Sequence, residues 1–364
     1  NKHKQNSNNI LTKKYHIKKL YKENEIIEKV CVITNNEKII GFDKDLYDPK
    51  LAFEIMIPGF IDLQIYGALN SLLMVESDYL TIKKINTHNT KNGTFYFQPT
   101  IASESNSTIL KAIDGVKNYF SKGGKGCIGL HVEGPWINPL KKGAHSLKYI
   151  HSPEFDEVKK IIDYADGVIS MITIAPEVVS DQIIEFLIKK GIVISIGHSA
   201  LDFKSANYYF NKGIYTCTHL FNAMPQIHHR EPGLIEAILN EPNVFSSIIC
   251  DGYHVDFNMI KLAHKIKKNK LFCITDAVTE SNKGEYVHKL EGEIYKNKGV
   301  LSGSSITMLQ SFKNLIQKVG LSVSDAVKMC CYTPSKVISP KIKINQLEIN
   351  SYCTFNILDE NYNL

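Results

Sequence analysis

Residues 127–135 read CIGLHVEGP, a short apolar run that ends in polar residues, and this pattern decides the fold. An apolar run of this length between turn-forming residues is typical of a buried strand. Seven further runs of the same kind lie along the chain, separated by longer stretches with helical spacing. They are EIMIPGFIDLQIY (54–66), TFYFQPT (94–100), VISMITIAPE (168–177), IVISIGHS (192–199), TCTHLFN (216–222), FSSIICDGYHV (245–255) and LFCITDAV (271–278).

The stretches between these runs have the pattern of amphipathic helices. In DQIIEFLIKKG (181–191) and FNMIKLAHKIKK (257–268), apolar residues recur three and four positions apart, and basic residues gather near the end. Eight alternations of strand and helix predict an α/β fold with a closed parallel sheet, the (β/α)8 or TIM barrel.

The two ends of the chain follow a different pattern. Residues 15–52 and 341–364 alternate in short strand-like pieces separated by Asn, Gly and Asp. We therefore predict a small β-sandwich domain built from residues 1–57 and 341–364, and a catalytic barrel over residues 58–340. Residues 1–22 hold seven lysines and no acidic residue, which favours a solvated tail, with a trimmed leader as the alternative.

Composition narrows the class of protein. Hydrophobic residues make up 43% of the 364 residues, enough for a large core, so a wholly disordered chain is excluded. The net charge of +6 is mild and unclustered, and we expect no nucleic-acid partner. No apolar run approaches the ~18 residues of a membrane span. The eight cysteines are scattered without a C-x-x-C pair, which predicts reduced thiols in a cytoplasmic protein.

Ionisable residues stand at the ends of most of the predicted strands. One such residue is usually structural, but in a barrel the carboxyl ends of all strands face a common volume, where active sites lie. The residues are His131 and Glu133 after the third run, His198 after the fifth, His219 after the sixth, His254 after the seventh and Asp276 after the eighth. So many ionisable groups at one end of a barrel predict an active site.

A carboxylate and two imidazoles on different strands suit a catalytic divalent ion, because they bind it and leave one position open. Glu133, His198 and His219 are the predicted ligands. Water activated at such an ion still needs a base, and Asp276 is the predicted one. The structural alternative for Asp276 is an N-cap of the following segment.

Longer motifs carry a family resemblance. They are HVEGPWINPLKKGAH (131–145), GHSA (197–200), THLFNAM (218–224), REPG (230–233), DGYHVD (251–256), TDAV (275–278) and LSGSSITM (301–308). Over residues 58–334 they resemble, in the same order, the motifs of the N-acetylglucosamine-6-phosphate deacetylases of the amidohydrolase superfamily. The resemblance implies a metal-dependent barrel with a small β domain and one divalent ion per chain, Zn²⁺ first, with Fe²⁺, Co²⁺ or Mn²⁺ as alternatives.

The resemblance also implies a substrate site for a phosphorylated amino sugar. Catalysis would use Asp276 and His145, and the implied substrate contacts are Gln64, His145, Asn222, Ala223, Arg230, His254, Leu301 and Gly303. The guanidinium of Arg230 suits a phosphate, and the N–H groups of Asn222 and Ala223 can add to an anion cradle. The implied assembly is a homodimer in which His254 approaches the neighbouring site; the alternative is that His254 serves its own chain.

One departure from the superfamily stands at the end of the first run. Many amidohydrolases have H-x-H there for a second metal, whereas this chain has Gln64-Ile65-Tyr66, which offers no imidazole. This difference favours a single metal. Tyr66 also stands where the deacetylases usually have Asn or His, so we expect an altered pocket at this position.

The implied reaction is hydrolysis of the acetamido group of N-acetylglucosamine 6-phosphate to glucosamine 6-phosphate and acetate. Three alternatives remain open: deacetylation of the galactosamine epimer, another amidohydrolase reaction, and a catalytically silent barrel that acts as a binding protein. Cyclic amidases of the superfamily usually bridge two metals with a carboxylated lysine. Glu133 ends the third run instead, which disfavours that reaction.

Overall fold

The structure is a computed structural model that describes residues 11–339 and 341–364, and the chain divides into two compact units. The larger unit spans Phe60–Lys343, and the smaller one combines the chain up to Gly59 with Ile344–Leu364. Residues 1–10 of the predicted tail lie outside the described residues. The rest of that tail is not a solvated segment, because Thr12–Tyr21 forms strand β1 and buries Ile17 and Leu20.

Eight parallel strands form the barrel of the larger unit, in the order β14-β13-β12-β11-β10-β9-β8-β5. Their bounds are β5 (Phe60–Ile65), β8 (Thr94–Ile101), β9 (Leu130–Glu133), β10 (Ile169–Ile174), β11 (Val193–Ile196), β12 (Thr216–Cys217), β13 (Phe245–Ile249) and β14 (Leu271–Ile274). The two edges meet where the N–H of Asp276 donates to the carbonyl of Gln64, 3.0 Å away, and the N–H of Tyr66 donates to that of Ala277, 2.9 Å away. The predicted (β/α)8 barrel is confirmed.

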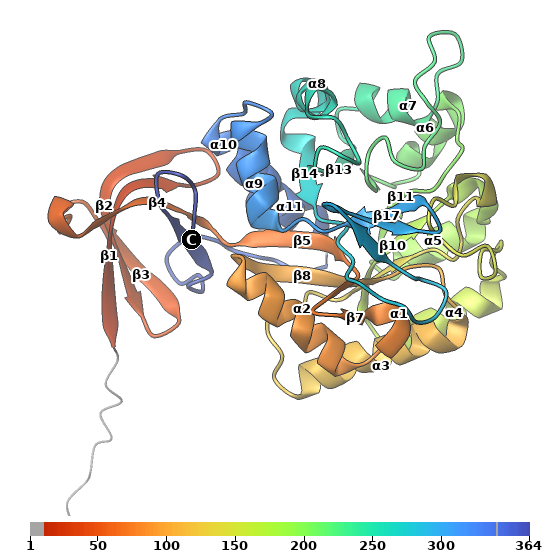
Figure 1. Cartoon of the computed structure of the whole chain (residues 1–364), viewed down its shortest axis with the longest axis horizontal. Coiled ribbons are helices and arrows are strands. Elements are labelled where there is room, and N and C mark those ends of the chain that lie inside the picture. Colours follow the sequence, from red (N-terminus) through yellow and green to blue (C-terminus); the bar gives the residue numbers. More distant parts are fainter. Residues whose placement is uncertain (1–10, 340) are drawn as a thin grey trace, which may run out of the picture. The chain divides into compact units, whose positions relative to one another are not determined.

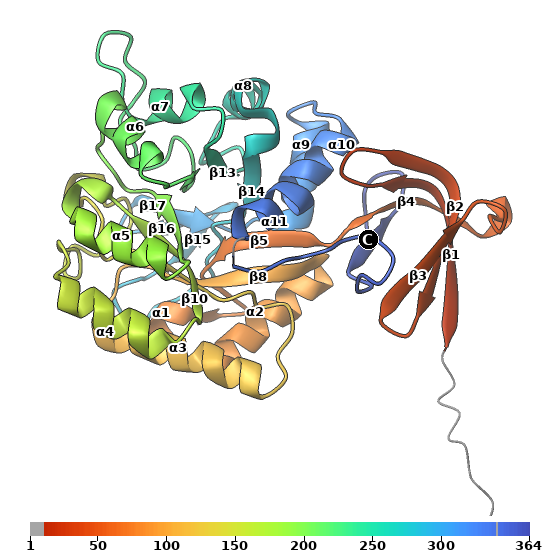
Figure 2. The ribbon, with the colours of Figure 1, turned by 180° about the vertical axis from the view of Figure 1, so that it is seen from behind.

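Helices cover the outside of this sheet (Figures 1 and 2). They are α2 (Tyr79–Lys91), α3 (Asn106–Ser121), α4 (Phe155–Ala165), α5 (Asp181–Lys189), α6 (Phe203–Asn211), α7 (Leu234–Asn240), α8 (Phe257–Lys267) and α9 (Met308–Gln317). The two helices predicted from spacing are α5 and α8. In α5, the side chain of Ser180 caps the first turn, and Ile183, Ile184 and Leu187 form the buried face.

The first predicted strand, residues 54–66, is two strands. β4 (Ala52–Pro58) belongs to the smaller unit and β5 to the barrel, so the boundary between the units falls at Gly59. Pro58 has no N–H to continue a ladder, and the N–H of Gly59 donates to the carbonyl of Thr354, 2.8 Å away, rather than to a barrel strand. A continuous apolar run does not show where a chain changes its pairing partner.

The smaller unit is built around one sheet. Its strands are β1, β2 (Ile26–Asn35), β3 (Lys38–Asp43), β4 and β18 (Phe355–Leu358), in the order β18-β4-β1-β2-β3. The predicted sandwich of the two chain ends thus takes the form of a single five-stranded sheet. Side chains of Ile17, Val32 and Met56 pack with Leu347 in its core.

An insertion separates β14 from α9. It contains a three-stranded antiparallel sheet of β15 (Lys289–Glu291), β16 (Ile294–Asn297) and β17 (Val300–Ser304). The N–H of Ser304 donates to the carbonyl of Asp276, 3.0 Å away, so the end of β17 lies beside the chain that follows β14. Gly303 has φ +126°, and a Cβ there would lie 2.7 Å from Val278, so glycine is required for this close approach.

The remaining elements are short. They are α1 (Leu73–Glu76), α10 (Val323–Val327), a π-helical turn (Lys328–Tyr332), α11 (Thr333–Ile338) and the two-stranded sheet of β6 (Gly67–Ala68) and β7 (Ser71–Leu72). Within the described residues, no helix has the length and apolar character needed to cross a membrane. All eight cysteines are free thiols, six of them buried, in agreement with the predicted reduced core.

Candidate active site

Four of the predicted functional residues stand at the carboxyl ends of barrel strands. Glu133 is the last residue of β9. His198 lies two positions after β11, His219 two positions after β12, and Asp276 two positions after β14. These last three have left-handed backbones, with φ of 51°, 38° and 53°. Such a conformation costs a residue other than glycine of order 1–3 kcal/mol and is concentrated at functional sites. All four residues line one cavity at the barrel mouth.

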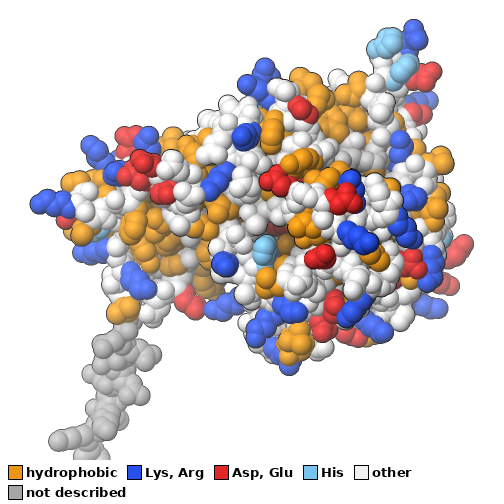
Figure 3. All heavy atoms as spheres, in the orientation of Figure 1, with side chains coloured by type: hydrophobic (Ala, Val, Ile, Leu, Met, Phe, Trp, Pro, Cys, Tyr) orange, Lys and Arg blue, Asp and Glu red, His pale blue; other side chains and the backbone are white. Residues whose placement is uncertain are grey.

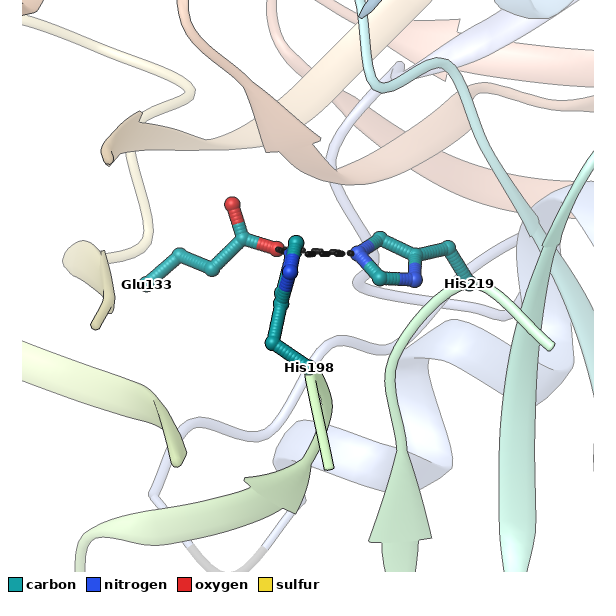
Figure 4. A group of neighbouring side chains, drawn as sticks. All are labelled: Glu133, His198 and His219. Carbon is teal, nitrogen blue, oxygen red and sulfur yellow. Dashed lines mark hydrogen bonds and ion pairs between the residues drawn. The ribbon is translucent and has the colours of Figure 1, made fainter. Parts of the chain in front are cut away.

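Glu133, His198 and His219 converge on one point (Figure 4). Glu133 Oε1 lies 3.2 Å from His198 Nε2 and 3.0 Å from His219 Nε2, and the two Nε2 atoms are 3.1 Å apart. All three side chains are buried. Each therefore presents one ligand atom to the same small volume, which is the geometry of a three-ligand metal site.

Hydrogen bonds on the far side of the two rings fix which nitrogen is protonated. His198 Nδ1 lies 2.8 Å from the carbonyl of Lys141, and His219 Nδ1 lies 3.2 Å from that of Asn222. A carbonyl only accepts, so each neutral ring carries its proton on Nδ1 and presents a lone pair at Nε2. Two lone pairs and the Glu133 carboxylate then meet without a proton between them. This donor set fits a divalent cation.

The second oxygen of Glu133 is held by other groups. The Tyr66 hydroxyl donates to Oε2, and His145 Nε2 lies 3.1 Å from the same atom. His145 Nδ1 accepts from the N–H of Ser103 at 3.2 Å, so Nε2 of the neutral ring carries the proton. Burial opposes ionisation of Glu133, but the neighbouring rings of His145, His198 and His219 together outweigh it, and the pKa of Glu133 lies well below its usual value.

Asp276 lies beside the ligand group without belonging to it. Its Oδ1 accepts from Gln64 Nε2 at 2.8 Å and lies 3.1 Å from the Tyr66 hydroxyl. Burial raises the pKa of Asp276 to about 6, which suits a general base near neutral pH. The alternative role as an N-cap is not observed, because β15 to β17 follow Asp276 and Thr307 caps the next helix, α9.

Most of the residues assigned to the substrate line the same cavity. These are His145, Asn222, Ala223, His254, Leu301 and Gly303. His254 Nδ1 lies 2.6 Å from Asp251 Oδ2 of its own chain, and its ring faces the cavity that contains its own Asp276. His254 therefore lies at the cavity of its own chain, and its approach to the neighbouring site of a homodimer stays a prediction.

The anion cradle differs from the expected one. The N–H of Asn222 donates to the carbonyl of His219, 2.9 Å away, and closes the turn that follows β12. It is therefore not available to a phosphate. The N–H of Ala223 remains, at a residue whose φ of 53° places it in a left-handed turn at the cavity.

Three predicted residues lie outside the cavity lining. Gln64 is buried behind Tyr66 and donates to carboxylates instead of facing a substrate. Arg230 is exposed on the loop that leads into α7. The tip of this loop projects from the surface and carries histidine and basic side chains (Figure 3). His131 lies inside the barrel, where its ring nitrogens contact the carbonyl of Leu63 and the hydroxyl of Thr173 at 3.0 and 2.7 Å.

Two cavity residues, and one residue behind the lining, had no role assigned from the sequence. Tyr286 and His288 reach the cavity from the insertion before α9, and Ser103 at the end of β8 holds His145. Ser103 follows a predicted strand, so its position was a usable signal. The other two lie in a segment without strand periodicity, and nothing in the sequence marked them.

Comparisons with known proteins agree with this geometry. The sequence pattern of the amidohydrolase family matches residues 55–363. The N-acetylglucosamine-6-phosphate deacetylase of Haemophilus influenzae is 28% identical over 360 residues, 94% of each chain, and that of Lysinibacillus sphaericus is 30% identical over 298 residues, 78% of this chain and 76% of its own. The crystal structure of the N-acetylglucosamine-6-phosphate deacetylase from Pasteurella multocida has a TM-score of 0.89 at 28% identity, covering 96% of this chain and 97% of its own.

Proposed function

This chain belongs to the amidohydrolase family, and we propose that it is a deacetylase that hydrolyses N-acetylglucosamine 6-phosphate to glucosamine 6-phosphate and acetate. The observation that carries the proposal is the convergence of Glu133, His198 and His219 on one point beside Asp276. In a catalytically silent barrel, nothing would require His198 and His219 to carry their protons on Nδ1 and to turn both Nε2 lone pairs toward the Glu133 carboxylate.

The reaction divides between the ion and the side chains around it. A bound divalent ion would polarise the amide carbonyl and lower the pKa of water at this point. Asp276 takes a proton from the attacking water and returns it to the amine nitrogen as the C–N bond breaks. Gln64 Nε2 donates to Asp276 Oδ1, which leaves Oδ2 for the proton. The Nε2–H of His145, whose nitrogen lies 3.1 Å from Glu133 Oε2, turns from that oxygen to donate to the developing oxyanion.

The ligand set also supports a choice of metal. Two imidazoles and a carboxylate with an open position are typical of catalytic Zn²⁺, and Fe²⁺, Co²⁺ and Mn²⁺ accept the same ligands. At the end of β5, where a second ion would need imidazoles, the chain has Gln64 and Tyr66. We therefore propose one ion per chain, with Zn²⁺ as the first candidate.

Acetate release after metal removal tests the function directly. We expect the chelated protein to release no acetate from N-acetylglucosamine 6-phosphate, and one equivalent of Zn²⁺ per chain to restore the full rate. N-acetylgalactosamine 6-phosphate, assayed in parallel, tests the epimeric alternative. A requirement for two equivalents would contradict the single site, and no release from either epimer with metal present would contradict the deacetylase.

The position of Arg230 supports a role across a dimer interface. The resemblance of its motif implies a substrate contact for this residue, yet it is exposed on a loop and absent from the lining of its own cavity. We propose that the active unit is a homodimer in which Arg230 binds the phosphate held by the other subunit, as a bidentate donor.

Mixing two defective chains tests this arrangement. An Asp276→Asn chain and an Arg230→Ala chain should recover activity when combined, because each mixed dimer has one site with native Asp276 and a donated Arg230. A second mixture, of Asp276→Asn with His254→Ala, tests His254 in the same way. Recovery would show that His254 is donated across the interface, and no recovery would place it in the site of its own chain, whose cavity it lines. Absence of recovery in the first mixture, despite demonstrated subunit exchange, would place Arg230 in its own chain's site, and a monomer in solution would exclude the dimer.

A further inference from the structure

Two carboxylates approach one another beside the ligand group, and a phenol stands between them. The Tyr66 hydroxyl donates to Glu133 Oε2 and lies 3.1 Å from Asp276 Oδ1. The Tyr66 side chain is 5% exposed and lines the cavity. Buried tyrosine hydroxyls normally find a partner, but a pair of functional carboxylates is an unusual one.

A count of protons shows how this contact is satisfied. Tyr66 has one hydroxyl proton, and the Gln64 amide has two. The hydroxyl proton goes to Glu133 Oε2, while Gln64 Nε2 lies 2.7 Å from the Tyr66 oxygen, 2.8 Å from Asp276 Oδ1 and 3.1 Å from Glu133 Oε1. Three protons from two neutral side chains therefore separate the two negative groups. A second cation is therefore not needed to offset the repulsion between the carboxylates of Glu133 and Asp276.

The same contact fixes how Glu133 can bind a metal. Its Oε2 is held by Tyr66 and lies 3.1 Å from His145 Nε2, so it is turned away from His198 and His219. Only Oε1 faces the two Nε2 atoms. Partners of this kind, which orient a ligand without touching the ion, commonly change metal affinity by ~10–100-fold when they are removed.

We propose that Tyr66 is a positioning residue that holds Glu133 as a one-oxygen ligand and fills the space between Glu133 and Asp276 with a neutral donor. The inference rests on the ion site of the proposed function. It assigns a specific role to the buried side chain that directly follows β5.

Removal of the hydroxyl alone tests the proposal. Tyr66→Phe keeps the buried ring, and we expect Zn²⁺ binding to the apoprotein to weaken by ~10–100-fold, measured by competition with a chelator of known affinity. Turnover should fall with little change in KM, because the phenol acts on the ligand and base, not on substrate binding.

Tyr119→Phe is the matched control. Tyr119 is also buried, at 4% exposure, but its hydroxyl donates to the backbone carbonyl of Lys125 at 2.7 Å, and neither residue lines the cavity. Tyr119→Phe also loses one buried hydroxyl, so the Tm of its apoprotein should change by a similar amount. Its Zn²⁺ affinity should stay at the wild-type value.

A second variant separates the two neutral donors. Gln64→Met removes the amide protons from Asp276 and from Glu133 Oε1, 3.1 Å away, but leaves the phenol on Glu133 Oε2. Because the amide competes with an ion for Oε1 while the phenol holds the other oxygen, this variant should weaken Zn²⁺ binding less than Tyr66→Phe does. Wild-type affinity in Tyr66→Phe, or an equal loss in the Tyr119 control or in Gln64→Met, would overturn the proposal. Because metal binding is measured without substrate, these results stand apart from the outcome of the acetate assay.

Discussion

Replacement of His219 by alanine is expected to abolish metal binding and deacetylation together. His219 Nε2 is one of three ligand atoms, and it lies within 3.1 Å of both other ligand atoms, Glu133 Oε1 and His198 Nε2. The variant keeps a buried carboxylate and one imidazole, too few to hold an ion against competing water. Metal analysis after dialysis should find no stoichiometric ion, and acetate release should fall to background.

A histidine away from the site provides the control. His151 is half-exposed on the surface, where its Nε2 pairs with Glu157 at 2.9 Å. His151→Ala should keep both the ion and the rate. A His219→Ala chain that retained one equivalent of metal would show that the ion does not use this ligand.

Unfolding gives a second measure of the same prediction. A ligand that binds only the folded state stabilises it, so Zn²⁺ should raise the Tm of the wild-type apoprotein. In His219→Ala the same addition should leave the Tm unchanged. A loss of activity without loss of this metal-dependent shift would mean that His219 acts on the substrate and not on the ion.

The barrel and the ends of its strands could be predicted because both depend on local pattern. Apolar runs mark the strands, and the topology of a parallel barrel then brings Glu133, His198, His219 and Asp276 to one mouth, although they are far apart in the chain. The length of a strand was less accessible. β12 has two residues where the apolar run suggested seven, because the backbone turns at His219, whose φ is 38°.

Contacts between side chains from distant strands could not be predicted in this way. The hydroxyl of Tyr66 meets Glu133 only when two rotamers and the tilt of two strands are fixed together. The resemblance implies a substrate contact for Gln64, but its amide donates to Asp276 instead. The place of Arg230 depends on the path of an exposed loop, which no hydrophobic pattern constrains.

Asp276→Asn should have the opposite signature to His219→Ala: the ion stays, and turnover falls by at least ~100-fold, the usual scale for loss of a general acid or base. Asparagine has nearly the same shape as aspartate, and its oxygen can still accept the hydrogen bond that Gln64 Nε2 gives to Oδ1. It cannot take a proton from water. Metal analysis and the rate of acetate release, measured on the same preparation, check both halves of the expectation.

The pH dependence identifies the step that is lost. Burial raises the pKa of Asp276 to about 6, and a divalent cation bound nearby lowers it by favouring the charged form. The basic carboxylate therefore forms as the pH rises, and kcat/KM of the wild type should increase with pH through a limb at or below about 6. In Asp276→Asn the small residual rate should lack this limb. A variant with near-normal turnover, or with the wild-type limb intact, would show that another group accepts the proton.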